Sequence, residues 1–428
     1  MAFLDETGLA ELWSLVKEND VMASKKAFQV GDTLNTIRTD LGENWFLCNG
    51  DLVNASELSD EFRNMLGVGW GKKTIADSYT NSANGLYMCR RWVTHGDEII
   101  TYGADRTSRY PQIYIANKEN PLDFETVTIA NSKQYIAALA YGNGLWVAVT
   151  CSGALSSGAL YVYTATDLRG PWTGRTNAVA NVPHPGAGYI TLAYGNGTWA
   201  VAYKNSSDSN YLTTSYTTDP LGDWTTYRIT NEVLAPVDLL YEANQWVLLV
   251  PSRMYYTADI TQQNKWKAAY YINPNLAYSA YGLYHINEYY IICTRYTDSN
   301  DDGYPAIFYA TDITGTWKRA RISSDLITEA RSITYENGQW VVACGKPVLY
   351  MASSLDGEWT KSVPTDSNGD DMTAYSMTDI TYVDGRRWLL GDHSGGIVIS
   401  EQICTLPSVS IDGVYTYIKA KEDEKSVG

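Results

Sequence analysis

The sequence predicts an all-β fold, a seven-bladed β-propeller, preceded by a short N-terminal α-helix and a small segment before the first blade. Three observations predict it. A turn motif recurs seven times, a second motif ending in Trp follows most copies, and the aromatic residues are 34 Tyr and 14 Trp against 6 Phe. Tyrosine favours half-buried strands because its ring is apolar and its hydroxyl can face water.

The first motif is a two-residue turn between apolar runs. Tyr141-Gly-Asn-Gly-Leu-Trp146 returns at Tyr194 to Trp199 and at Tyr335 to Trp340. Asn-Gly predicts a hairpin because both residues accept a positive φ. Weaker copies place Asn244 and Asn287 at the second glycine position, where Asn is the next-best residue. The aromatic markers after the turn stand at positions 87, 146, 199, 246, 289, 340 and 388. Their spacing of roughly 50 residues matches a blade of four strands.

The second motif is Thr-Asp-x-x-Gly-x-Trp. Asp167, Asp219 and Asp312 each precede a Trp by five residues. The Asp side chain can accept hydrogen bonds from its own turn, and the Trp can anchor the next strand between blades. From both motifs we expect the following tryptophans to hold the blades: Trp146, Trp172, Trp199, Trp224, Trp246, Trp317, Trp340, Trp359 and Trp388.

The second motif resembles the Asp-box of sialidase-type bacterial propellers, although that family places Ser-x-Asp-x-Gly before the Trp. The resemblance covers roughly residues 70 to 420 and implies the fold, not the ligand. After the last marker, residues 396–400 predict a third strand and residues 406–419 a fourth, so the ring can close without the N-terminus. A six-bladed ring with an outlying first copy is the alternative.

Residues 5–18 predict a helix with one apolar face. Leu9, Leu12, Trp13 and Val16 follow the i, i+3, i+4, i+7 pattern. A single helix this short is marginal in water, so the apolar face needs a partner. That partner is either the rest of this domain, or copies of the helix or a neighbouring virion protein, and the sequence leaves the two open.

Residues 30–58 contain Val30-Gly-Asp-Thr, then Trp45-Phe-Leu-Cys-Asn-Gly50, then an apolar pair at Leu52-Val53. This order resembles the tail-collar segment of phage tail fibres, and both termini look like those of phage structural proteins. The alternative is that residues 30–66 only begin the packing of the propeller. The predicted domains are a helical attachment and oligomerisation segment (1–28), a collar-like segment (29–70) and the propeller (71–428).

Charge and composition exclude several functions. The net charge is −16, which opposes nucleic acid as a partner. The N-terminus lacks the basic and apolar regions of a signal peptide, and no apolar run is long enough to span a membrane. Six scattered cysteines, without C-x-x-C pairs, predict free thiols in a protein made in a reducing host cytoplasm.

Catalytic and metal-binding motifs are weak. Tyr227-Arg-Ile-Thr230 faintly resembles a sialidase signature but lacks its Pro and lies within the propeller. No cofactor and no catalytic residue is therefore predicted. Asp298, Asn300 and Asp302 have the spacing of a Ca²⁺ loop, but position twelve is Tyr309 instead of Glu. A solvated loop without Ca²⁺ is the favoured interpretation.

The functional hypothesis is a non-enzymatic phage virion protein, associated with the tail. The N-terminal segment is expected to contact other virion proteins and to form a homo-oligomer. The propeller is expected to bind a host-surface glycan or protein, without membrane insertion. The alternatives are a glycan-cleaving enzyme of the sialidase or glycosidase type, and a purely structural spacer. Carboxylates converging at the channel mouth would favour the enzyme.

Overall fold

The structure is a computed structural model, and 32 strands occur among the residues that it describes. It describes residues 33–36, 45–48, 52–54, 58–59, 69–74, 91–105, 108–117, 124–152, 160–179, 190–205, 211–231, 235–270, 278–297, 303–324, 329–345, 348–365, 377–383, 386–391, 396–405 and 415–419. Within these ranges the structure contains no α-helix, and a single 3₁₀ turn, η4, occurs at Gln263–Lys265. The class is therefore all-β, and the helix predicted over residues 5–18 lies outside the described residues.

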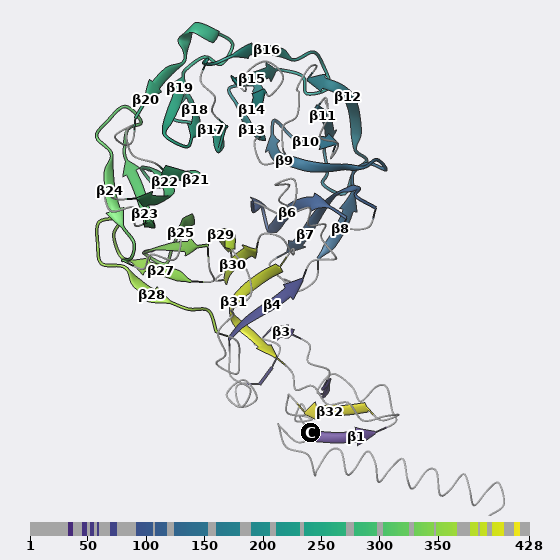
Figure 1. Ribbon diagram of the computed structural model, residues 1–428. Helices are drawn as coiled ribbons and strands as arrows, with labels where there is room; N and C mark the ends of the chain where they lie inside the picture. Colours follow the sequence, from purple (N-terminus) through teal and green to yellow (C-terminus); the bar gives the residue numbers. More distant parts are fainter. Residues whose placement is uncertain are drawn as a thin grey trace, which may run out of the picture. The chain divides into compact units, whose positions relative to one another are not determined.

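Six antiparallel sheets are each built from four consecutive strands, and they are arranged in a ring (Figure 1). The first three blades comprise β5 (Val93–His95), β6 (Glu98–Ala104), β7 (Pro111–Asn117) and β8 (Glu125–Thr128); β9 (Gln134–Gly142), β10 (Leu145–Ser152), β11 (Leu160–Ala165) and β12 (Thr173–Val179); and β13 (Ile190–Gly195), β14 (Thr198–Asn205), β15 (Tyr211–Thr217) and β16 (Thr225–Arg228). The next three comprise β17 (Asp238–Glu242), β18 (Gln245–Val250), β19 (Arg253–Thr257) and β20 (Lys267–Ala269); β21 (Tyr278–Ile286), β22 (Tyr289–Thr297), β23 (Gly303–Ala310) and β24 (Lys318–Arg321); and β25 (Ala330–Glu336), β26 (Gln339–Cys344), β27 (Leu349–Ala352) and β28 (Thr360–Ser362).

Two further sheets combine strands from both ends of the chain. A five-stranded sheet contains β29 (Met377–Val383), β30 (Arg386–Gly391), β31 (Gly396–Thr405), β3 (Leu52–Asn54) and β4 (Gly69–Thr74). A three-stranded sheet places β32 (Tyr415–Lys419) between β1 (Thr33–Thr36) and β2 (Trp45–Leu47). The contacts divide the chain into one unit of residues 1–71, 365–371 and 400–428, and a second unit of residues 72–364 and 372–399.

The prediction of seven blades is wrong. Six repeats form four-stranded blades. The last repeat instead contributes three strands, β29 to β31, to the five-stranded sheet. The C-terminal strand was expected to complete a seventh blade, but β32 pairs with β1 and β2. The last repeat also lacks the Trp of the second motif, which in the second to sixth blades leads into the fourth strand.

The repeated turns have the conformation that their sequences require. Asn143 and Gly144 have φ of 50° and 76°, and Asn196 and Gly197 have 47° and 75°. In the fourth blade, Asn244 takes the glycine position at 61°. These values are those of the type I′ hairpin, whose twist matches that of the flanking strands.

Two of the predicted markers are misplaced. In the fifth blade Ile286 pairs with Tyr289, so Tyr290, not Tyr289, occupies the position of Trp146. In the first blade the hairpin joins His95 to Glu98, which puts Ile99 at the marker position. The predicted turn near position 87 lies outside the described residues. The first hairpin was missed because its turn, Gly96-Asp97, carries no aromatic marker.

The glycine that precedes the turn makes room for the neighbouring blade. A Cβ on Gly142 would lie 2.3 Å from the ring of Tyr194, and one on Gly195 would lie 2.1 Å from the ring of Tyr241. Each Tyr therefore rests on the hairpin of the blade before it. The motif requires glycine at this position for close approach, and at the turn itself for positive φ.

The second motif forms a turn that is closed by hydrogen bonds to the Asp carboxylate and from the Trp indole. The carboxylates of Asp167, Asp219 and Asp312 each accept the amide hydrogen two residues on, at 2.7–3.0 Å. The indole Nε1 of Trp172 donates to the carbonyl of Leu168 at 2.9 Å, and Trp224 and Trp317 repeat this contact. These hydrogen bonds lower the pKa of Asp312.

The core lies between the blades. Apolar side chains from facing sheets form clusters that join β5–β8 to β9–β12, β13–β16 to β17–β20, β17–β20 to β21–β24, and β21–β24 to β25–β28. The second strand of each blade is apolar on both sides because it is covered by a neighbour on each face, as in Val247, Leu248 and Leu249, all 0% exposed.

The two roles of glycine predict different outcomes for substitution. Gly195→Ala should lower the free energy of unfolding by about 1–3 kcal/mol, because the new Cβ overlaps the Tyr241 ring. Gly197→Asn should cost less than about 1 kcal/mol, because Asn adopts positive φ and nothing lies near a Cβ there. Urea unfolding of both variants tests this, and equal losses would contradict the role given to Gly195.

Candidate functional site

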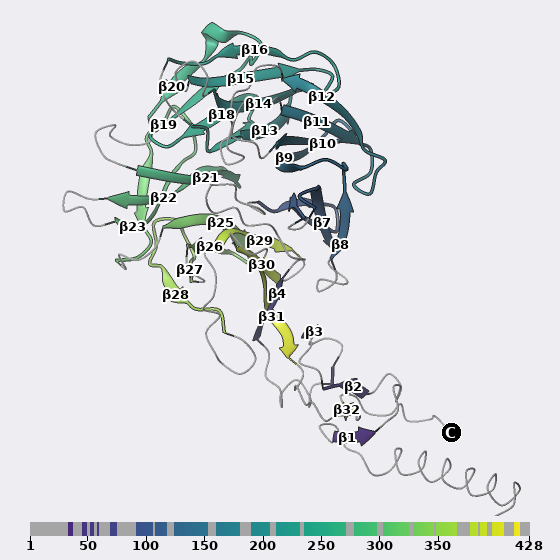
Figure 2. The ribbon, with the colours of Figure 1, turned by 45° about the vertical axis from the view of Figure 1, so that its right-hand side comes forward.

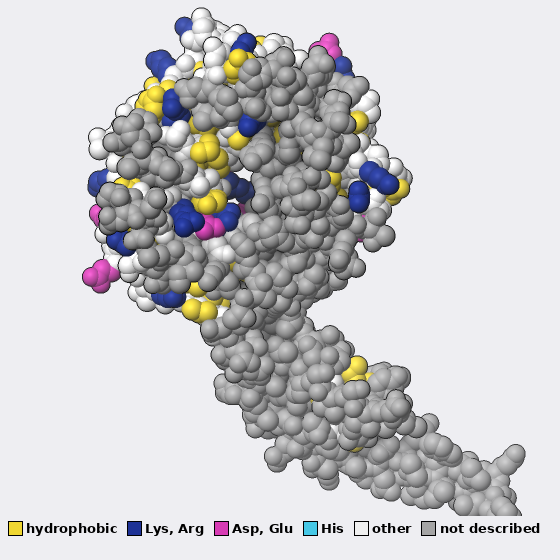
Figure 3. All heavy atoms as spheres, in the orientation of Figure 1, with side chains coloured by type: hydrophobic (Ala, Val, Ile, Leu, Met, Phe, Trp, Pro, Cys, Tyr) yellow, Lys and Arg dark blue, Asp and Glu magenta, His cyan; other side chains and the backbone are white. Residues whose placement is uncertain are grey.

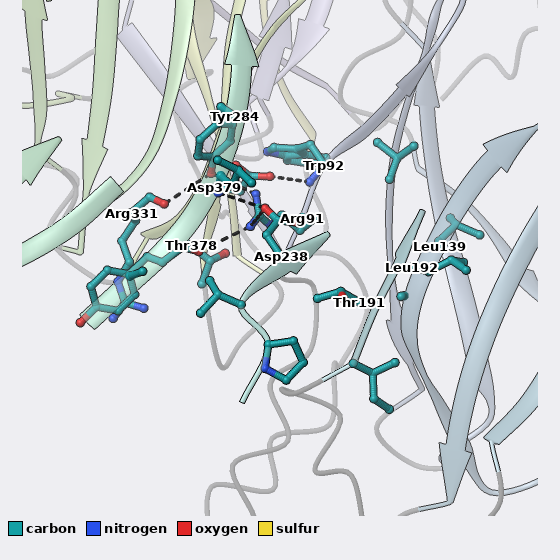
Figure 4. Close-up of a pocket in the computed structure, with 18 of the residues that line it drawn as sticks. Arg91, Trp92, Leu139, Thr191, Leu192, Asp238, Tyr284, Arg331, Thr378 and Asp379 are labelled. Atoms are coloured by element: carbon teal, nitrogen blue, oxygen red, sulfur yellow. Dashed lines mark hydrogen bonds and ion pairs between the residues drawn. The ribbon is translucent and has the colours of Figure 1, made fainter. Parts of the chain in front are cut away.

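A cavity of about 920 Å³ lies at the centre of the ring. Every four-stranded blade contributes residues to it from its first strand or from just before that strand. Strand β29 also contributes residues. Figure 4 shows the labelled residues pointing into it from β-strands on several sides. The cavity is therefore a product of the ring as a whole, and residues far apart in sequence meet there.

Four β-bulges supply side chains to this cavity. The register of the first strand shifts by one residue at Ala137, Tyr281, Arg331 and Thr378, leaving each without a cross-strand partner. All four line the cavity. A bulge turns the extra residue out of the regular alternation, which explains why two large side chains, Tyr281 and Arg331, face the channel.

Arg91 crosses the channel. It lies two residues before β5, yet its Nη2 is 2.7 Å from Oδ2 of Asp238 at the start of β17. Its Nη1 donates to the hydroxyl of Tyr284 on β21 at 3.1 Å, and Nη2 also approaches the carbonyl of Tyr281 at 3.5 Å. Burial is the largest single effect and disfavours the cation, but the combined effects of Asp238, Tyr284, Asp379 and Tyr102 exceed it, so the pKa of Arg91 lies well above its usual value.

Both carboxylates of the channel are held by backbone amides. Asp238 accepts from the amides of Leu239 and Leu283 at 3.0 and 3.1 Å, in addition to Arg91. Asp379 is 4% exposed and accepts from the amides of Trp92 and Ile380 at 2.8 and 3.0 Å.

The hydroxyl of Ser332 also donates to Asp379. Burial raises the pKa of Asp379, against the opposing effects of Arg91 and of these hydrogen bonds.

Arg331 is the second cation of the channel. Its guanidinium lies 4.2 Å from the centre of the Tyr281 ring, and its Nε donates to Oε1 of Glu329 at 2.8 Å. Its side chain is 25% exposed, so the outer edge of the guanidinium remains in contact with solvent. The Arg331 guanidinium lies on one ring and pairs with one carboxylate, which leaves N–H donors that a ligand can engage.

Both channel carboxylates are held by hydrogen bonds from the protein. Each of their oxygens accepts at least one hydrogen bond. No group of three or more His, Cys, Asp or Glu that could hold a metal occurs among the described residues. The cavity is lined by threonines, tyrosines and two arginines, together with apolar residues such as Leu139, Leu192 and Pro236.

The predicted site residues are placed as follows. The markers Trp146, Trp199, Trp246 and Trp340 are 1–4% exposed between blades. Trp172, Trp224, Trp317 and Trp359 are half-buried at the turn into the fourth strand. Trp388 lies on β30, opposite Thr381. The ring does not bring these tryptophans to the channel.

The other predicted residues lie outside the described residues. These are the Ca²⁺ candidates Asp298, Asn300 and Asp302, and the helix residues Leu9, Leu12, Trp13 and Val16. Four cysteines, Cys48, Cys151, Cys293 and Cys344, are free and buried, and burial raises the pKa of Cys151 to about 12.

The channel residues were missed by sequence reasoning, although the repeat contains a signal for them. Asp238, Ser332 and Asp379 each stand three residues before the Tyr of the turn, at Tyr241, Tyr335 and Tyr382. Alignment of the repeats at this position would have revealed polar residues in the innermost strand, where apolar ones are expected. The partner Arg91 lies before the first recognisable motif and gives no such signal.

Comparison with known proteins identifies the fold alone. No protein-family model matches the sequence, and no curated protein matches it. Among solved structures, YCF48 bound to a D1 peptide is similar over 78% of this chain and 95% of that chain, with 10% identity and a TM-score of 0.53.

YCF48 from Cyanidioschyzon merolae is similar over 78% of this chain and 98% of that chain, with 8% identity and a TM-score of 0.52. Chaetomium thermophilum Raptor is similar over 79% of this chain and 30% of that chain, with 10% identity and a TM-score of 0.50. The chain is a β-propeller of repeated blades. Among the described residues, no helix is long and apolar enough to cross a membrane.

The contact between Arg91 and Asp238 can be measured by a double-mutant cycle. Arg91→Met should lower the free energy of unfolding by about 1–3 kcal/mol, between the values for exposed and buried ion pairs, because the pair is about one quarter exposed. Adding Asp238→Asn should cost less than the sum of the single changes, by about 1 kcal/mol. Full additivity would show that the two side chains do not interact.

Asp379 predicts a pH dependence. The pKa of Asp379 is raised in the folded state, so the folded protein binds this proton more tightly than the unfolded chain does. The resulting stabilisation is complete below the pKa of about 4 in the unfolded chain, and it is lost as pH rises through the pKa in the folded protein. Asp379→Asn leaves one amide hydrogen without an acceptor and should cost about 1–3 kcal/mol. The stability difference between wild type and variant should shrink as pH rises above 4, measured by urea unfolding at several pH values. A difference that grows with pH would contradict the assignment.

Proposed function

We propose that the propeller is a binding module and that its channel receives part of the ligand. One observation carries the proposal. A cavity of about 920 Å³ gathers hydroxyls, tyrosines and arginines from the whole ring, while its carboxylates are occupied by hydrogen bonds from the protein. A concave site with a few convergent polar groups is the usual form of a small-ligand or saccharide site.

The ligand class that fits the cavity is polyhydroxylated or peptidic. Hydroxyl groups such as those of Thr94, Thr191 and Thr381 can both donate and accept, which suits the alternating donors and acceptors of a sugar. Tyr281 and Tyr284 add ring surfaces for stacking. YCF48, which has the same fold, was solved bound to a peptide, and this adds support for a binding role.

A glycosidase is the second candidate because two carboxylates and two arginines do converge in the channel. Asp379, with a raised pKa, is the side chain best suited to be a general acid. Its 4% exposure and its hydrogen bonds to Trp92, Ser332 and Ile380 argue for a positioning role instead.

We further propose that the module is displayed on a phage virion, through an N-terminal segment that assembles with other virion proteins. This rests on the resemblance of residues 30–58 to a tail-collar segment and of both termini to phage structural proteins. Deleting residues 1–28 should abolish oligomerisation and incorporation into particles, measured by mass photometry and by immunoblotting of purified particles. Unchanged assembly would refute the attachment role.

The binding role is tested by filling the channel. Thr191 lines the cavity, so Thr191→Phe in the full chain should weaken binding to array glycans or bacterial cells at least tenfold while thermal stability is retained. The matched control is Thr225→Phe, at an exposed position on the outer strand of the same blade, which should bind as wild type.

Catalysis is tested with the same glycans. A binding module leaves them intact, whereas an enzyme releases reducing ends that disappear in Asp379→Asn. Turnover by the wild type would replace the binding role by the glycosidase. Equal binding by Thr191→Phe and wild type would remove the channel from the site.

A further inference from the structure

Among the described residues, most cations that lie on an aromatic ring are at one end of the ring of blades. In each antiparallel blade the first and third strands begin, and the second and fourth end, at the same side of the sheet. This is the side where the first strands enter the channel. Figure 3 shows dark-blue Lys and Arg side chains, with a magenta carboxylate, around the hollow at the middle of the face in view.

Five arginine–tyrosine pairs lie at this end, on four successive blades. We call them the arginine–tyrosine arc. The pairs, with the distance from the guanidinium carbon to the ring centre, are Arg228 on Tyr211 (4.1 Å), Arg253 on Tyr270 (4.9 Å), Arg319 on Tyr296 (4.3 Å), Arg321 on Tyr304 (4.1 Å) and Arg331 on Tyr281 (4.2 Å).

The two pairs on β21–β24 adjoin each other, with their Tyr rings tilted by 43°. The rings of Tyr296 and Tyr304 face each other across β22 and β23 with centres 5.1 Å apart, and Arg319 and Arg321 cover them from β24. Both arginines are exposed. Stacking holds each guanidinium flat and leaves its edge donors facing solvent.

The arginines of the arc all lie on tyrosine rings, and Arg331 also pairs with Glu329, whereas an arginine at the opposite end is held by two acids. Arg169, in a turn at that opposite end, contacts Glu98 and Glu125 at 2.6 and 2.8 Å. Arg228, Arg319 and Arg321 have no carboxylate partner within the described part of the chain. In a protein of net charge −16, exposed arginines that lie on tyrosine rings on one face indicate a surface that can take an anion supplied from outside.

We propose that the arginine–tyrosine arc binds a carboxylate-bearing polysaccharide, and this rests on the proposed binding function of the channel face. A guanidinium edge matches a carboxylate with two parallel hydrogen bonds. The Tyr rings offer apolar surface beside each cation for the face of a sugar ring. A polymer with a carboxylate at regular intervals can engage pairs on neighbouring blades together, which raises affinity beyond that of one contact.

An acidic peptide is the competing ligand. A peptide that docks by main-chain pairing needs an exposed strand edge. The arc offers side-chain contacts on the ends of sheets, where strands begin and end, and its stacked arginines are spread over four blades. Repeated, separated carboxylates favour the polysaccharide.

The test uses the full chain and four immobilised probes: polygalacturonate, dextran, poly-glutamate and a sulfated glycan, heparin. Polygalacturonate should bind best, and its affinity should fall as salt rises. Arg319→Gln with Arg321→Gln should weaken that binding at least tenfold and flatten its salt dependence. Lys318→Gln removes one positive charge from the same exposed strand, against two in the double variant. Lys318 lies over a different ring, Tyr309, and this variant should bind as wild type.

Each other outcome overturns the inference. Preference for poly-glutamate would identify an acidic-peptide surface, and preference for heparin would mean that charge density, not the carboxylate, is recognised. An equal loss of polygalacturonate binding in Lys318→Gln would mean that net charge, not the arc, determines binding. Binding of dextran alone, unaffected by the arginine changes but lost in Thr191→Phe, would preserve the channel function while refuting the arc. Binding of no glycan would refute both.

Discussion

Polar contacts join the segment before the first blade to β29 of the five-stranded sheet and, across the channel, to β17 and β21. The amide of Trp92, just before the first inner strand, donates to Asp379 on β29. Arg91 then extends across the channel to Asp238 and Tyr284. Apolar packing holds each blade to its neighbour, but apolar contacts are non-directional. The directional bonds to two carboxylates fix how the first strand enters the ring.

The same contacts hold the polar groups of the channel in place. A carboxylate that accepts hydrogen bonds from backbone amides cannot move without breaking them, and an unpaired buried carboxylate is costly. Asp238 and Asp379 therefore position Arg91 and the strand ends, and the groups left facing the cavity are hydroxyls, ring faces and the outer edge of Arg331. Rigidity of this kind lowers the entropy lost when a ligand binds.

The sequence predicted the repeat well and its ends poorly. Asn-Gly turns and Asp-Trp turns are local, because positive φ and a side-chain hydrogen bond are set within a few residues, so Asn143, Gly144 and Asp312 were correctly interpreted. Ring closure is not local. The tail strand at 415–419 has the composition of a blade strand, yet it pairs with β1 and β2, and only the partners available in three dimensions decide between those outcomes.

The bulges in the inner strands separate the pairing of the strands from the choice of side chain that lines the channel. Ala137, Tyr281, Arg331 and Thr378 take no part in the cross-strand ladder, so their side chains can be exchanged without loss of a ladder bond or a change of register. Ala at one position and Arg at another show how widely these residues already differ. Such positions allow a repeat protein to change its ligand preference by single substitutions while the fold, encoded in the turns and the second strands, stays constant.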